Sequence, residues 1–180
     1  WQQFLARVEA TENAVVLGLG DYLDWTRTTY RAPLAAVWGE VEKARQEYDT
    51  MVMEAFVYPF VDTTRNHCPS FSAKCLGLLE GNHHAKMLSH RFQKDGRTGT
   101  EIICNLLGVE YLGLSAWIRL AVSQNVGARS SLWGHVHNLN LVATHSTSSS
   151  GTLPASLASA QRLMGGLRGV DVFLTANDHR

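Results

Sequence analysis

The sequence predicts an α/β protein in which buried strands alternate with helices and carry polar side chains at their carboxyl ends. Short apolar runs punctuated by glycine are typical of strands in a parallel sheet. Four such runs end in a small cluster of Asp, Asn or His, and they occupy residues 14–19, 75–79, 139–144 and 170–175. In open α/β sheets, ligands bind at the carboxyl ends of the strands. We therefore expect the four clusters to meet at one site.

The composition is that of a single globular domain. Of the 180 residues, 45% are hydrophobic and 18% are charged, and the formal net charge is zero. A chain of this length can bury one core, so one domain over residues 1–180 is expected. A neutral chain has no global field that attracts nucleic acid or an anionic membrane. No apolar run approaches the roughly 20 residues of a membrane span, and three cysteines without a CxxC pair favour reduced thiols in the cytoplasm.

The first half of the chain is expected to form helices and two strands. Phe4 and Val8 recur at helical spacing, and Pro59 is expected to end or kink the helix in which it lies. The expected elements are a helix around Phe4, a strand at 14–19, a long amphipathic helix at 34–61, a loop at 67–72 and a strand at 75–79.

The second half is expected to begin with a helix that Gly108 ends in a left-handed conformation. An alternating apolar pattern then predicts a strand, and a turn returns the chain as its hairpin partner. The expected elements are a helix at 100–107, a strand at 111–122, a turn at 125–127, a hairpin partner at 131–133, a strand at 139–144, a helix at 154–165 and a strand at 170–175.

Taken in order along the chain, the polar clusters form a known constellation of motifs. Gly-Asp-x-x-Asp occupies residues 20–24, Gly-Asn-His occupies 81–83, an isolated histidine is His145, and Ala-Asn-Asp-His occupies 176–179. This order resembles the calcineurin-like metallophosphoesterases, particularly their short bacterial and phage-type members, and it covers residues 14–180. The resemblance implies a sandwich of mixed sheets flanked by helices, with the site at the carboxyl ends of the strands.

The resemblance implies that two divalent metal ions, Mn, Fe or Zn, take part in hydrolysis of a phosphate mono- or diester. Asp21 matches the carboxylate that bridges both ions. Asn82 and His145 match ligands of the second ion, while Asn177 and His179 match ligands of the first. The implied substrate is a phosphate ester of a small molecule, a phosphoprotein or a nucleic-acid end.

Two further residues match catalytic positions of the family. His83 matches the histidine that contacts the phosphate and assists the leaving group. Asp24 matches a residue that orients its neighbours through hydrogen bonds. The resemblance therefore predicts an enzyme, a hydrolase that acts on phosphoric ester bonds.

Three departures from the family pattern favour a second hypothesis. The family begins with Asp-x-His on a strand that has no counterpart before Trp1, so the chain is expected to be truncated at its N-terminus. Asn177 stands where the family has a histidine, and His84 stands where it has an acidic residue. The alternative is a degenerate, catalytically impaired homologue that acts as a binding or scaffolding module.

A second histidine pair competes for the last motif. Residues 134–137 read Gly-His-Val-His, and His135 and His137 are the alternative ligands. In that case His90 would be the isolated ligand, although it ends no predicted strand. The strand at 170–175 would also be left without a role, so the assignment given above is preferred.

Overall fold

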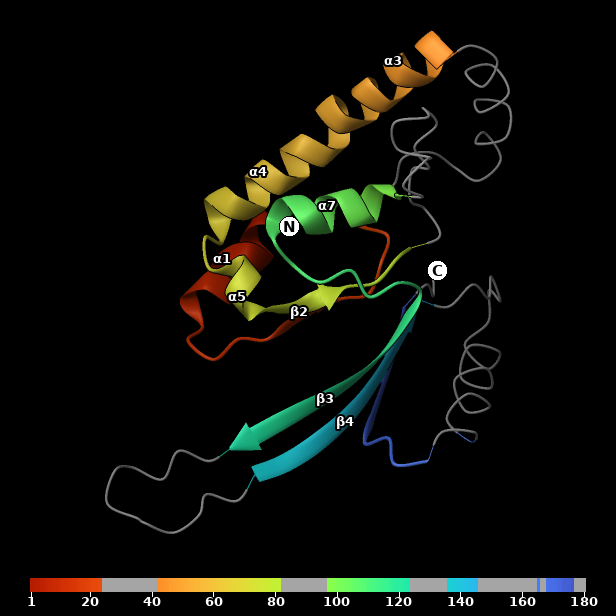
Figure 1. Cartoon of the computed structure of the whole chain (residues 1–180). Helices are drawn as coiled ribbons and strands as arrows, with labels where there is room; N and C mark the ends of the chain where they lie inside the picture. Colours follow the sequence, from red (N-terminus) through yellow and green to blue (C-terminus); the bar gives the residue numbers. More distant parts are fainter. Residues whose placement is uncertain (24–41, 82–96, 124–135, 146–164, 166–167, 177–180) are drawn as a thin grey trace, which may run out of the picture. The chain divides into compact units, whose positions relative to one another are not determined.

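The computed structural model describes residues 1–23, 42–81, 97–123, 136–145, 165 and 168–176 (Figure 1). These residues form a mixed α/β structure with mixed sheets, which confirms the predicted fold class at that level. Within the described ranges, no helix has both the length and the apolar character that crossing a membrane requires. The chain divides into two compact units, residues 1–114 and 115–180. The prediction of one domain over 1–180 stays a prediction.

The first unit contains the predicted helices and a pair of parallel strands. Its elements are α1 (Gln2–Ala10), β1 (Val16–Gly18), α3 (Glu42–Val52), the π-helical segment η1 (Met53–Val57), α4 (Tyr58–His67), α5 (Phe71–Lys74), β2 (Cys75–Leu78) and α7 (Gly99–Leu107). The N-terminal helix, both strands and the helix before Gly108 confirm the predictions. Gly108 has φ 70° and ends α7 in the left-handed conformation.

The helix predicted at 34–61 continues past Pro59, so its predicted end is wrong, while the alternative, a kink at Pro59, stays a prediction. The first part of that prediction, 34–41, lies outside the described residues. α3, η1 and α4 follow one another as a continuous helical ribbon up to His67 (Figure 1). Pro59 lies in the first turn of α4, directly after the π-helical segment. Proline has no amide hydrogen, and it is tolerated in the first turn of an α-helix because the amides of that turn have no carbonyl partner within the α-helix. The predicted loop at 67–72 is shorter than expected, since α5 already begins at Phe71.

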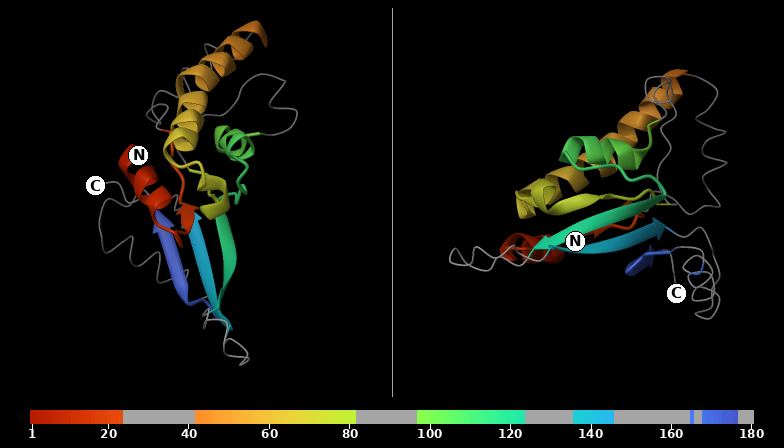
Figure 2. Two further views of the ribbon diagram at one scale, coloured as in Figure 1. Left: turned by 90° about the vertical axis from the view of Figure 1, so that its left-hand side faces the viewer. Right: turned by 60° about the horizontal axis from the view of Figure 1, so that its bottom comes forward.

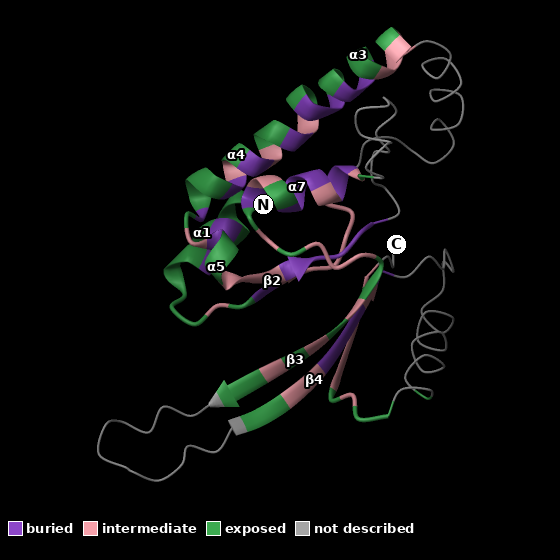
Figure 3. Cartoon of the chain, in the orientation of Figure 1, coloured by how far each residue is buried: buried purple, intermediate pink, exposed green. Residues whose placement is uncertain are grey.

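The core of the first unit lies between its helices and the β1–β2 pair. Buried residues occur along the α3–η1–α4 ribbon, on α7 and at the end of β2 (Figure 3). α7 contacts β2, η1 and α4, while α1 contacts α4 and α5. The largest fully buried side chains of this unit are Leu5, Val52, Val57, Thr64, Cys68, Leu79, Ile103 and Cys104.

Lys74 joins the C-terminal end of α1 to α5. Its Nζ donates hydrogen bonds to the carbonyl oxygens of Val8, Glu9 and Thr11 at 2.8, 3.0 and 2.9 Å. A cation at this position supplies donors to carbonyl oxygens at the end of α1, two of which also accept backbone amide hydrogens from Thr11 and Ala14, and it interacts favourably with the helix dipole. The Glu9 carboxylate accepts hydrogen bonds from the amide and hydroxyl of Ser70 at 3.1 and 2.6 Å.

Replacing Lys74 with Met is expected to lower the free energy of unfolding by about 1–2 kcal/mol. Methionine keeps the aliphatic part of the side chain and loses the three donated hydrogen bonds. Urea unfolding monitored by circular dichroism measures the change. Lys43→Met is the control, because Lys43 forms only an exposed ion pair with Glu47 at 4.0 Å, and such pairs contribute little. Equal effects of the two substitutions would contradict the capping role.

The second unit contains a sheet of three strands in the order β3-β4-β5 (Figure 2). The strands are β3 (Ser115–Ser123), β4 (Val136–His145) and β5 (Val172–Ala176). β3 and β4 pair antiparallel, whereas β4 and β5 pair parallel. The expectation that 139–144 belongs to a parallel sheet therefore holds only for its pairing with β5. β4 itself is the antiparallel partner of β3, while the predicted turn at 125–127 and partner at 131–133 lie outside the described residues.

The strand predicted at 111–122 is divided in the structure. Gly113, at φ 69°, interrupts the extended backbone, and β3 begins only at Ser115. The preceding residues pair with β2 instead, where Leu112 N–H donates to Leu78 O at 3.0 Å. The strand at 170–175 is confirmed as β5 with a small shift, and the helix predicted at 154–165 lies outside the described residues except for Gly165.

Candidate metal-binding segments

Two of the predicted site residues belong to the part of the chain that the structure describes. Asp21 lies in the first unit and His145 lies in the second. Their predicted meeting at one site stays a prediction. The other predicted site residues, which are Asp24, Asn82, His83, Asn177 and His179, lie outside the described residues.

β1 and β2 end side by side, so the first two motifs start at neighbouring points of one sheet. The strands are parallel, with Leu17 opposite Gly77 and Gly18 opposite Leu78. The pairing continues past β2, because Leu79 N–H donates to Gly18 O at 3.0 Å. Each strand then passes directly into its polar cluster, as expected for a site at the carboxyl ends of parallel strands.

Asp21 occupies a left-handed turn after β1. Gly20 has φ 99° and Asp21 has φ 54°, and among the described residues Asp21 is the only non-glycine with positive φ. Aspartate adopts this conformation more readily than most residues do. The Oδ2 atom of Asp21 is buried. The turn therefore holds the carboxylate in a defined, enclosed position.

Gly81 packs directly against this turn. A Cβ atom added at Gly81 would lie 2.2 Å from the backbone nitrogen of Asp21 and 2.2 Å from its Oδ1 atom. Only glycine allows so close an approach, because any side chain would collide with backbone atoms that cannot move independently. The close packing against Asp21 of the Gly-Asp-x-x-Asp motif thus requires a glycine at position 81 of the Gly-Asn-His motif.

Tyr22 fixes the same turn from the protein interior. Its hydroxyl oxygen accepts the amide hydrogen of Gly20 at 3.0 Å, and its ring lies 6.2 Å from that of Phe60. Gly18 makes room for the hydroxyl, since a Cβ there would lie 2.3 Å from Tyr22 Oη. Burial raises the pKa of the Tyr22 phenol well above its usual value. The phenol therefore stays neutral, and its contact with the turn does not change near pH 7.

A small cavity lies beside Asp21. Its lining includes Val52, the last residue of α3, Val57, the last residue of the π-helical segment, and Thr100 from the first turn of α7. π-Helical segments within α-helices occur frequently at functional sites. The irregular part of the long helix is therefore placed next to the Asp21 turn.

Glu80 precedes the Gly-Asn-His motif, and its side chain is only 3% exposed. Its carboxylate accepts hydrogen bonds from Thr98 Oγ1 at 2.6 Å, Tyr111 Oη at 2.7 Å and Thr100 Oγ1 at 3.0 Å. Burial, and then donation to the negative carboxylate, raise the pKa of Tyr111 to about 12. Sequence reasoning assigned no role to Glu80 or Tyr22. For Glu80 the available sequence signal was its position, an acidic residue directly after a run of apolar residues.

In the second unit, β4 and β5 also end side by side. His145 is the last residue of β4 and lies opposite Ala176, the last residue of β5. His145 is 3% exposed and lies on the same face of β4 as the buried residues Leu141 and Ala143. The parallel register thus brings His145 next to the residue that directly precedes Asn177.

The alternative pair His135 and His137 belongs to the other end of β4. His137 is exposed and pairs with Val122, and His135 lies outside the described residues. His145 lies eight positions after His137 along the strand, a distance of about 26 Å. The alternative pair therefore belongs to the start of β4, whereas the preferred assignment uses His145 at the end of β4 and the motif that follows β5.

The described residues include no group of three or more His, Cys, Asp or Glu side chains that could hold a metal ion. Most of the predicted ligands are not among them, so the metal site stays a prediction. The three cysteines form no disulfide in the structure, and their predicted reduced state stays a prediction. Burial raises the pKa of Cys75 to about 11 and that of Cys104 to about 12, so both thiols are neutral near pH 7.

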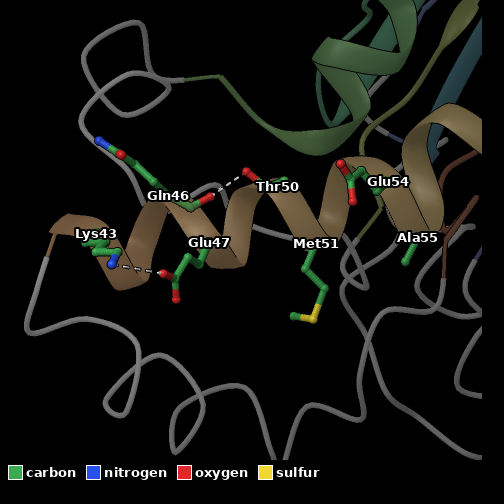
Figure 4. A pocket seen from close by; sticks show the side chains of 7 residues that line it. All are labelled: Lys43, Gln46, Glu47, Thr50, Met51, Glu54 and Ala55. Atoms are coloured by element: carbon green, nitrogen blue, oxygen red, sulfur yellow. Dashed lines mark hydrogen bonds and ion pairs between the residues drawn. The ribbon is translucent and has the colours of Figure 1, made fainter.

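A further pocket lies along one face of α3 and η1 (Figure 4). It contains the ion pair of Lys43 with Glu47, and Thr50 Oγ1 donates to the Gln46 carbonyl oxygen at 2.8 Å. All of its lining side chains come from one helical stretch, and none is a predicted site residue. We assign no function to this pocket.

Comparisons of the chain with protein families, with curated proteins and with solved structures give no match. The resemblance to the calcineurin-like metallophosphoesterases therefore depends on the motif residues and on their order along the chain.

Proposed function

We propose that the chain is a metal-dependent phosphoesterase of the calcineurin-like type, which hydrolyses phosphate mono- or diesters. The observation that carries the proposal is the Asp21 turn: a carboxylate at φ 54°, placed at the end of β1 and in close contact with Gly81 at the end of β2. The proposed fold is a sandwich of mixed sheets flanked by helices, with the site at the carboxyl ends of the strands.

The proposed ligands suit the proposed metals. Asp21 supplies a carboxylate, Asn82 and Asn177 supply amide oxygens, and His145 and His179 supply imidazoles. Mixed oxygen and nitrogen ligands suit Mn, Fe or Zn better than Ca. When bound, two such ions supply a Lewis acid for the phosphate and an activated water for in-line displacement.

The protein's own groups hold and orient the reactants in this proposal. The Asp21 turn is fixed by Tyr22 and Gly81, so its carboxylate needs little reorganisation to act as a ligand. His83 contacts the phosphate and gives a proton to the leaving-group oxygen, as a general acid does. Asp24 orients its neighbours through hydrogen bonds.

The test uses the protein expressed from its complete reading frame, stripped with a chelator and reloaded with Mn²⁺. It is expected to hydrolyse an aryl phosphodiester such as bis(4-nitrophenyl) phosphate, and the stripped protein is expected to show only the background rate. Release of nitrophenolate measures turnover, and elemental analysis measures bound metal. A folded protein that stays metal-free after loading with Mn²⁺ or Zn²⁺ would contradict the proposal and favour the binding or scaffolding alternative.

A further inference from the structure

Glu80 is a carboxylate at a buried position. It directly follows the buried residues Leu78 and Leu79, and it is itself 3% exposed. Burying a charged or polar group costs free energy unless hydrogen bonds replace the lost water. Three hydroxyl groups supply those bonds. The arrangement satisfies the carboxylate, and it also joins three segments of the unit.

The donors of these hydrogen bonds show which segments of the first unit the Glu80 side chain connects. Thr98 Oγ1 accepts the amide hydrogen of Glu101 at 3.1 Å as the N-terminal cap of α7, so its own hydrogen points to Glu80 Oε2. Tyr111 donates to the same oxygen, and Thr100 donates to Oε1. The side chain therefore ties the end of β2 to the start of α7 and to the segment that follows α7.

The backbone of Glu80 completes this anchor. Its amide donates to Gly113 O at 2.7 Å. The next residue is Gly81, whose missing side chain lets it lie against the backbone nitrogen and the carboxylate of Asp21. A displacement of Glu80 would therefore move Gly81, and Gly81 could not move toward the turn without colliding with Asp21.

We infer that Glu80 is a positioning residue for Asp21: its carboxylate, held by three hydroxyl groups, fixes the end of β2 and thereby the Asp21 turn. The consequence for metal binding rests on the proposed function. The consequence for the rigidity of the turn is independent of the proposed function, because it concerns only contacts within the first unit. The two can be measured separately.

The experiment compares Glu80→Gln with Glu110→Gln in the complete protein. Glutamine keeps the size of the Glu80 side chain, but it loses the charge and turns one acceptor into a donor that faces a hydroxyl group. Glu110 is the matched control, because it is exposed and contacts β2 through its backbone carbonyl. Hydrogen exchange of the metal-free protein, followed by mass spectrometry, measures the rigidity of the Asp21 turn. Titration with Mn²⁺ measures the affinity for the metal.

For Glu80→Gln we expect exchange to accelerate at residues 19–23 while α1 keeps its protection, and the Kd for Mn²⁺ to rise about tenfold. Glu110→Gln should change neither. Equal acceleration in all peptides with an unchanged Kd would show a merely structural role and overturn the inference. A wild-type protein that binds no Mn²⁺, together with local acceleration in the variant, would reject the proposed function and support the positioning role.

Tyr111→Phe keeps the inference testable if Glu80→Gln does not fold. It removes one of the three donors and leaves the charge unchanged. We expect the same pattern with a smaller effect, a rise in the Kd for Mn²⁺ of about threefold, since a single hydrogen bond is lost. Unchanged exchange at residues 19–23 in this variant would overturn the inference.

Discussion

Replacing Asp21 with Asn is expected to abolish Mn²⁺-dependent phosphoester hydrolysis while the protein stays folded. Asparagine has nearly the same shape as aspartate and also tolerates the left-handed conformation that Asp21 adopts at φ 54°. The substitution therefore keeps the turn and its contact with Gly81. It removes the negative charge and directs an amide group toward the metal, so the ligand that the proposal assigns to both ions is lost.

The expected fall in kcat/KM is at least about 10³-fold, which corresponds to about 4 kcal/mol of transition-state stabilisation. Steady-state kinetics measures the rate, elemental analysis measures the metal content, and thermal unfolding shows that the fold is kept. Asp62→Asn is the control, because Asp62 is an exposed carboxylate on α4. Full activity in Asp21→Asn would remove this residue from the metal site.

Elements that depend on local signals could be predicted from the sequence. The apolar run at 75–79 became β2, and the helix at 100–107 ends at Gly108, as the glycine indicated. The helical spacing of Phe4 and Val8 likewise became α1. In each case the side-chain pattern and the residues that end the element agree, and neither requires knowledge of distant contacts.

Elements decided by distant partners could not be placed in the same way. The segment around Tyr111 has the alternation of a continuing strand, but its backbone pairs with Leu78, which is 33 residues earlier in sequence than Tyr111. The turn at Gly113 then separates it from β3. The continuation of the helix past Pro59 also escaped prediction, because the π-helical segment before it changes which backbone groups need partners.

In the candidate site, too, the residues whose roles depend on distant partners could not be predicted from the sequence. Asp21 and Gly81 could be named from their motifs, because each follows a recognisable apolar run. The roles of Tyr22 and Glu80 could not, because they depend on hydrogen bonds that the sequence does not display. Glu80 bonds with groups 18 to 31 residues away, and only the folded unit brings them together.

The contact between Gly81 and Asp21 predicts a large effect of replacing Gly81 on both stability and Mn²⁺ binding. Gly81→Ala is expected to lower the free energy of unfolding by about 1–3 kcal/mol, the usual cost of overpacking, and to weaken Mn²⁺ binding strongly. A Cβ at Gly81 would lie 2.2 Å from the backbone nitrogen of Asp21 and 2.9 Å from its Cα. Those backbone atoms can move only if the turn changes its conformation, and the orientation of the Asp21 carboxylate would change with it.

Gly108→Ala separates this steric effect from the general cost of replacing a glycine. Gly108 has φ 70°, and a Cβ there would have nothing within 4 Å. Its replacement should therefore cost about 1 kcal/mol through backbone strain alone, with unchanged affinity for Mn²⁺. Chemical unfolding and Mn²⁺ titration of both variants give the comparison. If Gly81→Ala lost only stability, like Gly108→Ala, the close approach of the two strand ends would serve the fold and not the metal, because the affinity would then be independent of the geometry of the Asp21 turn.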